Sequence, residues 1–225
     1  MIKMRIEIDV SNVIVGWVLI EGIAEWDCTE GLSQRMDERG REALANADQP
    51  ESESLRESVR AMLRHHGYKA SGRSKPAQEY LMRCLREDGR LPTIYPAVDV
   101  LNATSASMGI PISMLKWSEF PTQTVWIRLG KIEDSYVFNS VGQTLDLKDL
   151  VAICGGFSGE VALGSPIKDS VRGKITREDR DALCILYGPR THLKEEQMMT
   201  IAQGFAEDLK KWTGCERISF GTQSC

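Results

Sequence analysis

Two polar residues one helical turn apart have side chains that could take part in catalysis. Asp99 and Asn102 lie in the segment VDVLNA, and their spacing places both side chains on one face of a helix. The amide could donate a hydrogen bond to an oxygen that gains negative charge during a reaction, and the carboxylate could orient a water molecule. The alternative is that both side chains bond to the neighbouring backbone and fix the turn at Tyr95 and Pro96.

Basic side chains form two clusters that could contact phosphate groups. The first cluster lies on an expected helix and just before it, and consists of Arg73, Lys75, Arg83, Arg86 and Arg90. The second cluster lies in a later loop and turn, and consists of Lys168, Arg172, Lys174, Arg177 and Arg180. The chain has a net charge of -4, so any contact with nucleic acid must come from local patches of this kind. Solvated helix faces have the same composition, which leaves that simpler explanation open.

Two helices joined by a proline-rich turn must position these residues. Ser74 is expected to be the N-cap of the first helix, with Pro76 in its first turn and the end near Gly89. The segment from Leu91 to Pro96 should be extended, because a residue that precedes proline is pushed out of the helical region. The second helix is expected over Ala97 to Met108, and Gly109 should end it.

The remaining pattern predicts an α+β fold, with a central sheet and a smaller β meander covered by four or five helices. In the N-terminal half we expect one or two strands in Met4 to Ala24, a polar helix over Thr29 to Ala47, a linker over Asp48 to Ser54 and a helix over Leu55 to His66, with His65 and His66 at its end. Short strands should follow from Pro121 to Leu163, and then a flexible connector over Gly164 to Lys174 and one helical turn between Thr176 and Asp179. The chain should close with a buried strand over Ala182 to Tyr187 and an amphipathic helix over Leu193 to Trp212. We expect one domain over residues 1–225. An alternative is two closely packed lobes, a helix-rich lobe over 1–120 and a lobe over 121–225 with the β meander and the C-terminal helix.

Composition and motifs exclude several classes of protein. The chain is 42% hydrophobic and 27% charged, as is ordinary for a globular protein. It has no P-loop, dinucleotide fingerprint or serine nucleophile elbow, and its six cysteines have no metal-ligand spacing, so neither a cofactor nor a metal is expected. The N-terminal apolar run is broken at Glu21, too early to span a bilayer, and we expect a cytoplasmic protein.

Three segments, taken in order, resemble a known family. They are GRSKPAQEYLMRCLREDGRLPTIYPAVDVLNATSASMGIPI, FNSVGQTLDLKDLVAI and DSVRGKITREDRDALCILYGPRTHLKEEQMMTIAQGFAEDLKKW, with a strand-like segment from Val13 to Glu21 before them. Their order and spacing are similar to those of the B3/B4 module, the tRNA-binding and editing region of the phenylalanyl-tRNA synthetase β subunit, and to those of free-standing proteins built from this module.

The resemblance implies a set of pocket residues. The family takes an Asn from the helix after the proline turn, a His shortly beyond it and a Glu on a late strand. In this chain Asn102 falls on the Asn, Ser113 on the His and Cys184 on the Glu, and Leu101 stands where the bacterial synthetases carry a hydroxyl residue. The imidazole and the carboxylate of the family scheme are therefore absent.

The resemblance implies a protein that binds the acceptor end of tRNA and hydrolyses a mischarged aminoacyl ester, with Asn102, Ser113 and Asp99 as catalytic candidates. Leu101 and Cys184 would line the pocket, and the basic clusters would bind the tRNA. The alternative is a module that binds tRNA or an amino-acid-like ligand without chemistry, which the substitutions at Ser113 and Cys184 favour. A protein-interaction scaffold is a third possibility.

Overall fold

A computed structural model of the protein describes residues 4–64 and 72–225 and confirms the expected α+β class. The strands are β1 (Arg5–Ile8), β2 (Val13–Glu21), β3 (Ile112–Lys116), β4 (Thr124–Leu129), β5 (Ser135–Val137), β6 (Thr144–Asp146), β7 (Val151–Gly155), β8 (Val161–Gly164), β9 (Ala182–Pro189) and β10 (Arg217–Ser224). The helices are α1 (Glu30–Asn46), α2 (Pro50–Met62), α3 (Ala77–Asp88), α4 (Pro96–Met108) and α5 (Glu195–Thr213), with short 3-10 turns at Gly72–Ser74 and Trp117–Glu119. His65 and His66 lie outside the described residues.

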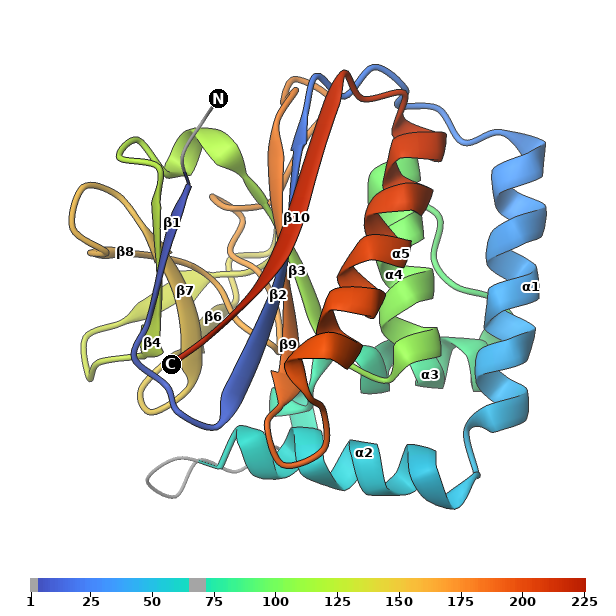
Figure 1. The fold of residues 1–225 in the computed structure, drawn as a ribbon, viewed down its shortest axis with the longest axis horizontal. Coiled ribbons are helices and arrows are strands. Elements are labelled where there is room, and N and C mark those ends of the chain that lie inside the picture. The colour runs from blue at the N-terminus through green and yellow to red at the C-terminus, as the bar shows by residue number, and fades with distance from the viewer. Residues whose placement is uncertain (1–3, 65–71) are drawn as a thin grey trace.

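Two four-stranded sheets and a helical layer form the molecule. One sheet has the strand order β10-β2-β9-β3 and is antiparallel throughout, whereas the other, β1-β4-β7-β8, contains one parallel pair, β1 with β4. A hairpin of β5 and β6 completes the β structure. Figure 1 shows α1, α3, α4 and α5 on one side of the β10-β2-β9-β3 sheet, with the second sheet on the other side and α2 across one end.

The central strands of the β10-β2-β9-β3 sheet, β2 and β9, are buried on both faces, which explains why they read as continuous apolar runs, whereas the edge strand β10 is mostly exposed or partly exposed. All eight residues of β9 are buried, and β2 has only two residues that are partly exposed. Helix α5 lies so close to β2 that a Cβ atom on Gly16 would lie 2.7 Å from the sulfur of Met198. The C-terminal elements β9, α5 and β10 thus pack on β2, and the chain returns to the sheet in which it began.

The helix ends follow the expected glycine and proline chemistry. Helix α3 stops at Gly89, with φ of 70°, and α4 stops at Gly109, with φ of 68°, a backbone conformation that residues with a Cβ atom rarely adopt. Pro96 occupies the first turn of α4, where a missing N–H is tolerated. These ends fix the turn between α3 and α4 and therefore the placement of the polar residues on α4.

Several expected boundaries were wrong. Helix α3 begins at Ala77 and not at Ser74, because Pro76 is itself extended, with ψ of 147°, and the residue before a proline avoids the helical region. Helix α2 begins at Pro50 and so includes most of the expected linker. The expected single turn after Thr176 is present, since Asp179 accepts hydrogen bonds from the N–H and the hydroxyl of Thr176 at 2.7 and 2.8 Å and its own N–H donates to the carbonyl of Thr176 at 3.0 Å.

Three features were not anticipated from the sequence. Strands β3 and β10 were not expected, and each forms an edge of the sheet that contains β2. The expected flexible connector over residues 164–174 is instead largely buried and hydrogen-bonded, with Ser165 and Ser170 at most 2% exposed. This loop packs against α3, since the N–H of Ala77 donates to the carbonyl of Pro166 at 2.9 Å.

Candidate binding groove

A cavity of about 1250 Å³ lies between α2, α3 and α4 and the loops beside β3, and we call it the helical groove. The three helices supply most of its lining. Further lining comes from the C-terminal end of α1, from Ile112 and Met114 of β3, and from the loops that carry Asn139, residues 165–175 and His192. The turn between α3 and α4 and the buried loop after β8 therefore meet at one site.

Asn102, a catalytic candidate from the sequence, lies on this groove, and its side-chain amide has no partner within the described protein. The residue is only 9% exposed and lines the groove, as does the neighbouring Leu101. Its side chain makes no hydrogen bond with any residue in the described part of the chain. A carboxamide has two donors and an acceptor, so Asn102 is available to a ligand.

Asp99 has a structural task. Its carboxylate accepts a hydrogen bond from the N–H of Ile94 at 2.7 Å and one from the thiol of Cys28 at 3.4 Å. Burial raises the pKa of Asp99 above its usual range. The residue is not part of the groove lining, and these contacts hold the entry to α4 in place. The expected backbone-fixing role thus describes Asp99 and not Asn102.

Ser113 does not line the groove itself, but its hydroxyl contacts Ser165 and Asp169, which do. In β3 successive side chains alternate between the two faces, and Ile112 and Met114 line the groove. The Ser113 hydroxyl lies 2.9 Å from the hydroxyl of Tyr187 and donates to the carbonyl of Ser165 at 3.4 Å. With 1% exposure, Ser113 belongs to a buried polar cluster between the sheets.

Cys184 is an interior residue of β9 with no exposed surface, and it does not line the groove. Burial raises the pKa of its thiol well above the ordinary value, and the negative charge of Asp169 acts in the same direction. A reactive thiol needs the opposite setting, an exposed and electropositive one. Cys184 therefore packs as a small apolar residue.

Parts of the two basic clusters converge on the groove. Lys75, Arg83 and Arg86 line it from the α3 side, and Lys168 and Lys174 line it from the loop after β8. The side chain of Arg73 lies outside the described part of the chain. Arg172 is directed elsewhere, because its guanidinium binds Glu119 at 2.7 Å and the residue does not line the groove.

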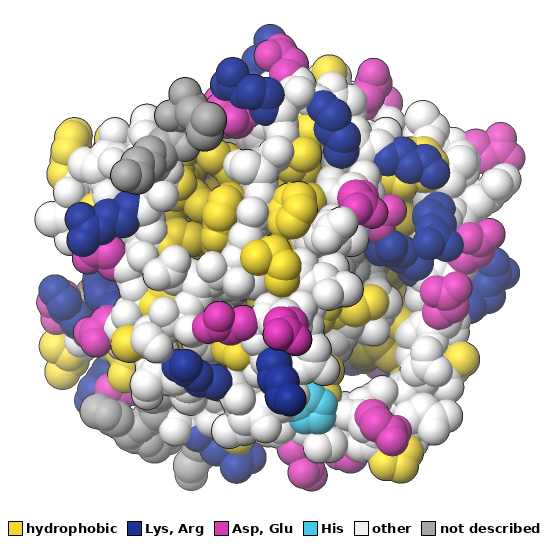
Figure 2. Space-filling view, in the orientation of Figure 1, with side chains coloured by type: hydrophobic (Ala, Val, Ile, Leu, Met, Phe, Trp, Pro, Cys, Tyr) yellow, Lys and Arg dark blue, Asp and Glu magenta, His cyan; other side chains and the backbone are white. Residues whose placement is uncertain are grey.

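The lining of the groove has more cationic than anionic side chains, whereas the protein as a whole has more anionic ones. Of the described residues that line it, seven are Lys or Arg and four are Asp or Glu, whereas the whole chain has a net charge of -4. On the face of the molecule with α5 and α1 in front, cationic and anionic side chains are instead interspersed (Figure 2). Four of these cations, Arg56, Arg60, Arg83 and Arg86, are held in ion pairs, so the attraction of the groove for anions rests on Lys75, Lys168 and Lys174.

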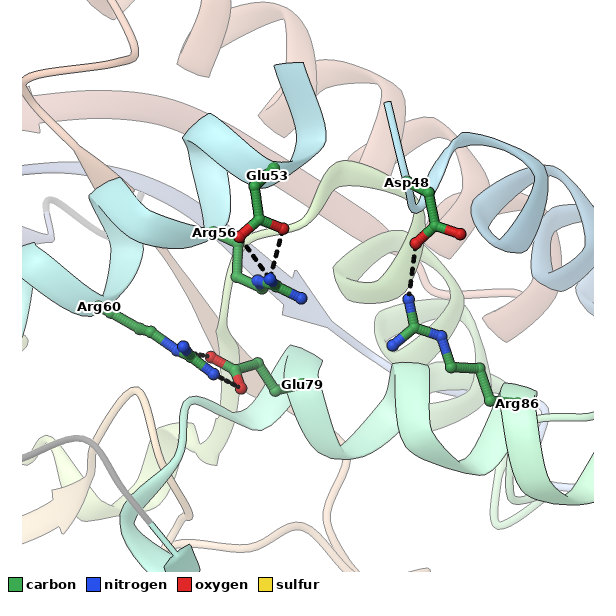
Figure 3. A network of polar contacts seen from close by, with 6 residues as sticks. All are labelled: Asp48, Glu53, Arg56, Arg60, Glu79 and Arg86. Atoms are coloured by element: carbon green, nitrogen blue, oxygen red, sulfur yellow. Dashed lines mark hydrogen bonds and ion pairs between the residues drawn. The ribbon is translucent and has the colours of Figure 1, made fainter. Parts of the chain in front are cut away.

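Ion pairs between α2, α3 and the α1–α2 turn form one rim of the groove (Figure 3). Arg60 of α2 binds Glu79 of α3 through two hydrogen bonds of 2.6 Å each, and Arg86 contacts Asp48 at 3.3 Å. Lys75 differs from these cations, since it is exposed and forms no ion pair or hydrogen bond with any described residue. Its ammonium group is free to meet an anionic ligand.

Asp169 is a groove residue that the sequence analysis missed. Its Oδ2 accepts a hydrogen bond from the N–H of Met114 at 3.2 Å, whereas its Oδ1 is buried and has no partner among the described residues. Burial raises the pKa of Asp169 to about 6, against the opposing effects of the Ser113 hydroxyl, the Met114 N–H and the charge of Lys174. In the sequence it was an acidic residue in a polar loop, a pattern typical of solvated surface.

The described residues favour binding by hydrogen bonds and positive charge. No group of three or more His, Cys, Asp or Glu side chains in residues 4–64 and 72–225 could hold a metal ion. No helix of the described chain has the length and apolar character needed to cross a membrane. The groove offers an open amide, a buried carboxylate and a cationic wall.

Comparisons with known proteins identify a distant resemblance of fold. No protein-family model matches the sequence, and no curated protein is similar enough in sequence to match it. A solved structure with a related fold is an N-terminal fragment of the phenylalanyl-tRNA synthetase β subunit from Pyrococcus horikoshii, with a TM-score of 0.49 and 8% sequence identity. The similarity covers 96% of this chain and 50% of that one, so this chain spans about half the length of that fragment.

Proposed function

We propose that the protein binds the aminoacylated 3′ end of a tRNA in the helical groove and hydrolyses the ester of a mischarged amino acid. The observation that carries this proposal is the convergence of three lysines, Lys75, Lys168 and Lys174, on one groove of an acidic protein. Phosphate groups are the anions that such a surface attracts most strongly in RNA. This role would place the protein in the cytoplasm.

Asn102 is the residue to which the proposal assigns a chemical role. In ester hydrolysis the oxygen of water bonds to the carbonyl carbon, and the bond from that carbon to the ribose oxygen then breaks. The products are the free amino acid and a tRNA with a 3′-terminal hydroxyl. The carbonyl oxygen gains negative charge as water adds, and the Asn102 amide would donate a hydrogen bond to it. The neighbouring ribose hydroxyl of the substrate would help to activate the water.

The second candidate is binding of tRNA or an amino-acid-like ligand without chemistry. It is favoured by the positions of Asp99 and Ser113, whose polar groups bond within the protein and do not line the groove. Of the three catalytic candidates from the sequence, Asn102 alone lines the groove. A binding site can operate with one open amide and a cationic wall.

A deacylation assay on a panel of mischarged tRNAs tests the enzymatic proposal. The wild-type protein should release the amino acid from at least one of them faster than buffer does, and Asn102→Ala should slow the release by about 100-fold or more, as loss of an oxyanion donor does. Gln203→Ala is the matched control and should keep full activity, because this exposed carboxamide lies on α5 and does not line the groove.

Binding measured in parallel separates the two candidates. Release no faster than in buffer for every pair, together with RNA binding that weakens steeply with salt, would refute hydrolysis and support the binding module. Salt-independent binding of a free amino acid, without binding of RNA, would refute the tRNA proposal.

A further inference from the structure

Helix α3 presents an exposed aromatic side chain on the helical groove. Tyr80 is 53% exposed and is part of the groove lining. Aromatic residues in a folded protein are mostly buried, because the ring contributes a large apolar area when it is removed from water. The exposed Tyr80 ring is therefore available for contact with a ligand.

A cation lies against the same ring. The guanidinium carbon of Arg83, one helical turn after Tyr80, is 5.1 Å from the ring centroid. This is the geometry of a cation–π contact, and the side chain of Arg83, which also lies 3.8 Å from the carboxylate of Glu87, remains 61% exposed. A planar guanidinium and a planar ring next to each other offer two flat surfaces of the kind on which nucleobases stack.

The surroundings of Tyr80 and Arg83 match a nucleic-acid strand better than a protein partner. The preceding residue, Glu79, is already bound by Arg60, so its negative charge is neutralised. Lys75 and Arg86 line the groove from the same side and add positive charge. Single-stranded nucleic acids bind where aromatic side chains alternate with cations that follow the phosphate backbone.

We propose that Tyr80 and Arg83 form a stacking subsite for an unpaired nucleobase at the 3′ end of the tRNA. This inference rests on the function proposed above and adds the part of the substrate that lies next to the reacting ester. The base would stack on the exposed ring, and Lys75 would contact an adjacent phosphate. The subsite would bind any base, because stacking on a ring does not depend on base identity.

Fluorescence anisotropy with a labelled single-stranded RNA that carries the 3′-terminal sequence of tRNA tests the subsite. Tyr80→Ala should weaken binding by about 5- to 100-fold, the usual effect of removing one stacking aromatic, and Tyr80→Phe should bind like the wild type. Phe157→Ala is the matched control, since Phe157 is 76% exposed but does not line the groove.

The salt dependence of binding distinguishes stacking from a general loss of charge contacts. Tyr80→Ala should leave the slope of log affinity against log salt unchanged, whereas Lys75→Ala should reduce it by about 0.7, the value for one phosphate of a single strand. Tyr80→Ala binding as tightly as Phe157→Ala would overturn the subsite and leave the proposed function intact. A wild-type protein that does not bind the RNA would overturn both.

Discussion

The ion pair between Arg60 and Glu79 should stabilise the protein measurably, unlike most ion pairs on a surface. The two side chains join α2 to α3 through two hydrogen bonds of 2.6 Å, and they are 31% and 11% exposed (Figure 3). The perturbation is a double-mutant cycle of Arg60→Met, which keeps most of the apolar stem, and Glu79→Gln, which keeps the shape but removes the charge.

The magnitude follows from exposure and geometry. Hydrogen bonds to charged groups contribute about 1.5–3 kcal/mol each in mutational series, but the exposed part of the Arg60 guanidinium is screened by water. Arg60→Met also leaves the Glu79 carboxylate largely buried without its partner, so we expect it to lower the free energy of unfolding by about 2 kcal/mol. The coupling energy of the cycle should be about 1–2 kcal/mol.

Urea denaturation followed by circular dichroism measures this coupling. The control cycle is Arg86 with Asp48, a contact of 3.3 Å whose side chains are 49% and 95% exposed, and it should give no more than about 0.3 kcal/mol. Equal coupling energies in the two cycles would contradict the reasoning that burial and two-point geometry make the Arg60–Glu79 pair strong. Because α2 and α3 both line the groove, the pair also fixes one of its dimensions.

Two further predictions concern the backbone and a buried carboxylate. Gly130→Ala should lower the free energy of unfolding by about 1–3 kcal/mol or more, because the new Cβ would lie 1.9 Å from the carbonyl oxygen of Leu147. Gly204→Ala, on the exposed side of α5 with nothing within 4 Å, should instead raise it by about 0.5–1 kcal/mol, and equal urea midpoints for these two variants would contradict both expectations. Asp169 has a pKa raised from 3.8 to about 6, so the folded state holds this proton more tightly than the unfolded state does. Its contribution favours folding below pH 3.8 and is lost as the pH rises through 6. Asp169→Asn should therefore be more stable than the wild type at pH 7, by an amount on the order of 1–3 kcal/mol that shrinks as the pH falls from 6 to 4. A difference that stays constant over this range in urea titrations would show that ionisation of Asp169 is not its cause.

Much of the helical part of the fold could be predicted because its determinants are local. Gly89 and Gly109 end their helices through their own backbone freedom, and Pro96 begins α4 through its fixed geometry. The N-cap of α3 was predicted two residues too early, at Ser74 instead of Pro76, since the effect of Pro76 on the preceding residue outweighed the capping preference of Ser74. The polar edge strand β10 lacks a strong apolar pattern and was not predicted.

The composition of the groove depended on contacts between segments far apart in the sequence. Asp169 had the appearance of a solvated loop residue until the loop was seen to pack against α3 and β3. Tyr80 was not singled out, because its exposure is set by the elements around α3 and not by α3 itself. A carboxylate or a ring cannot be assigned to a surface or to a site from its neighbours in sequence alone.

The sequence by itself determined the fold class, most helices and strands, and the position of Asn102 on α4, since propensity, capping and apolar periodicity act over a few residues. Only the tertiary structure decided which polar side chains share the groove. Met114 of β3 lines the groove and the adjacent Ser113 does not, and packing brings Lys75 and Lys168 from separate segments to the same groove. The physical reason is that the side chain of a strand residue points to one face of its sheet, and only the packing of the sheet shows what covers that face. In the same way, charged residues from distant segments share a groove only once the tertiary contacts bring those segments together.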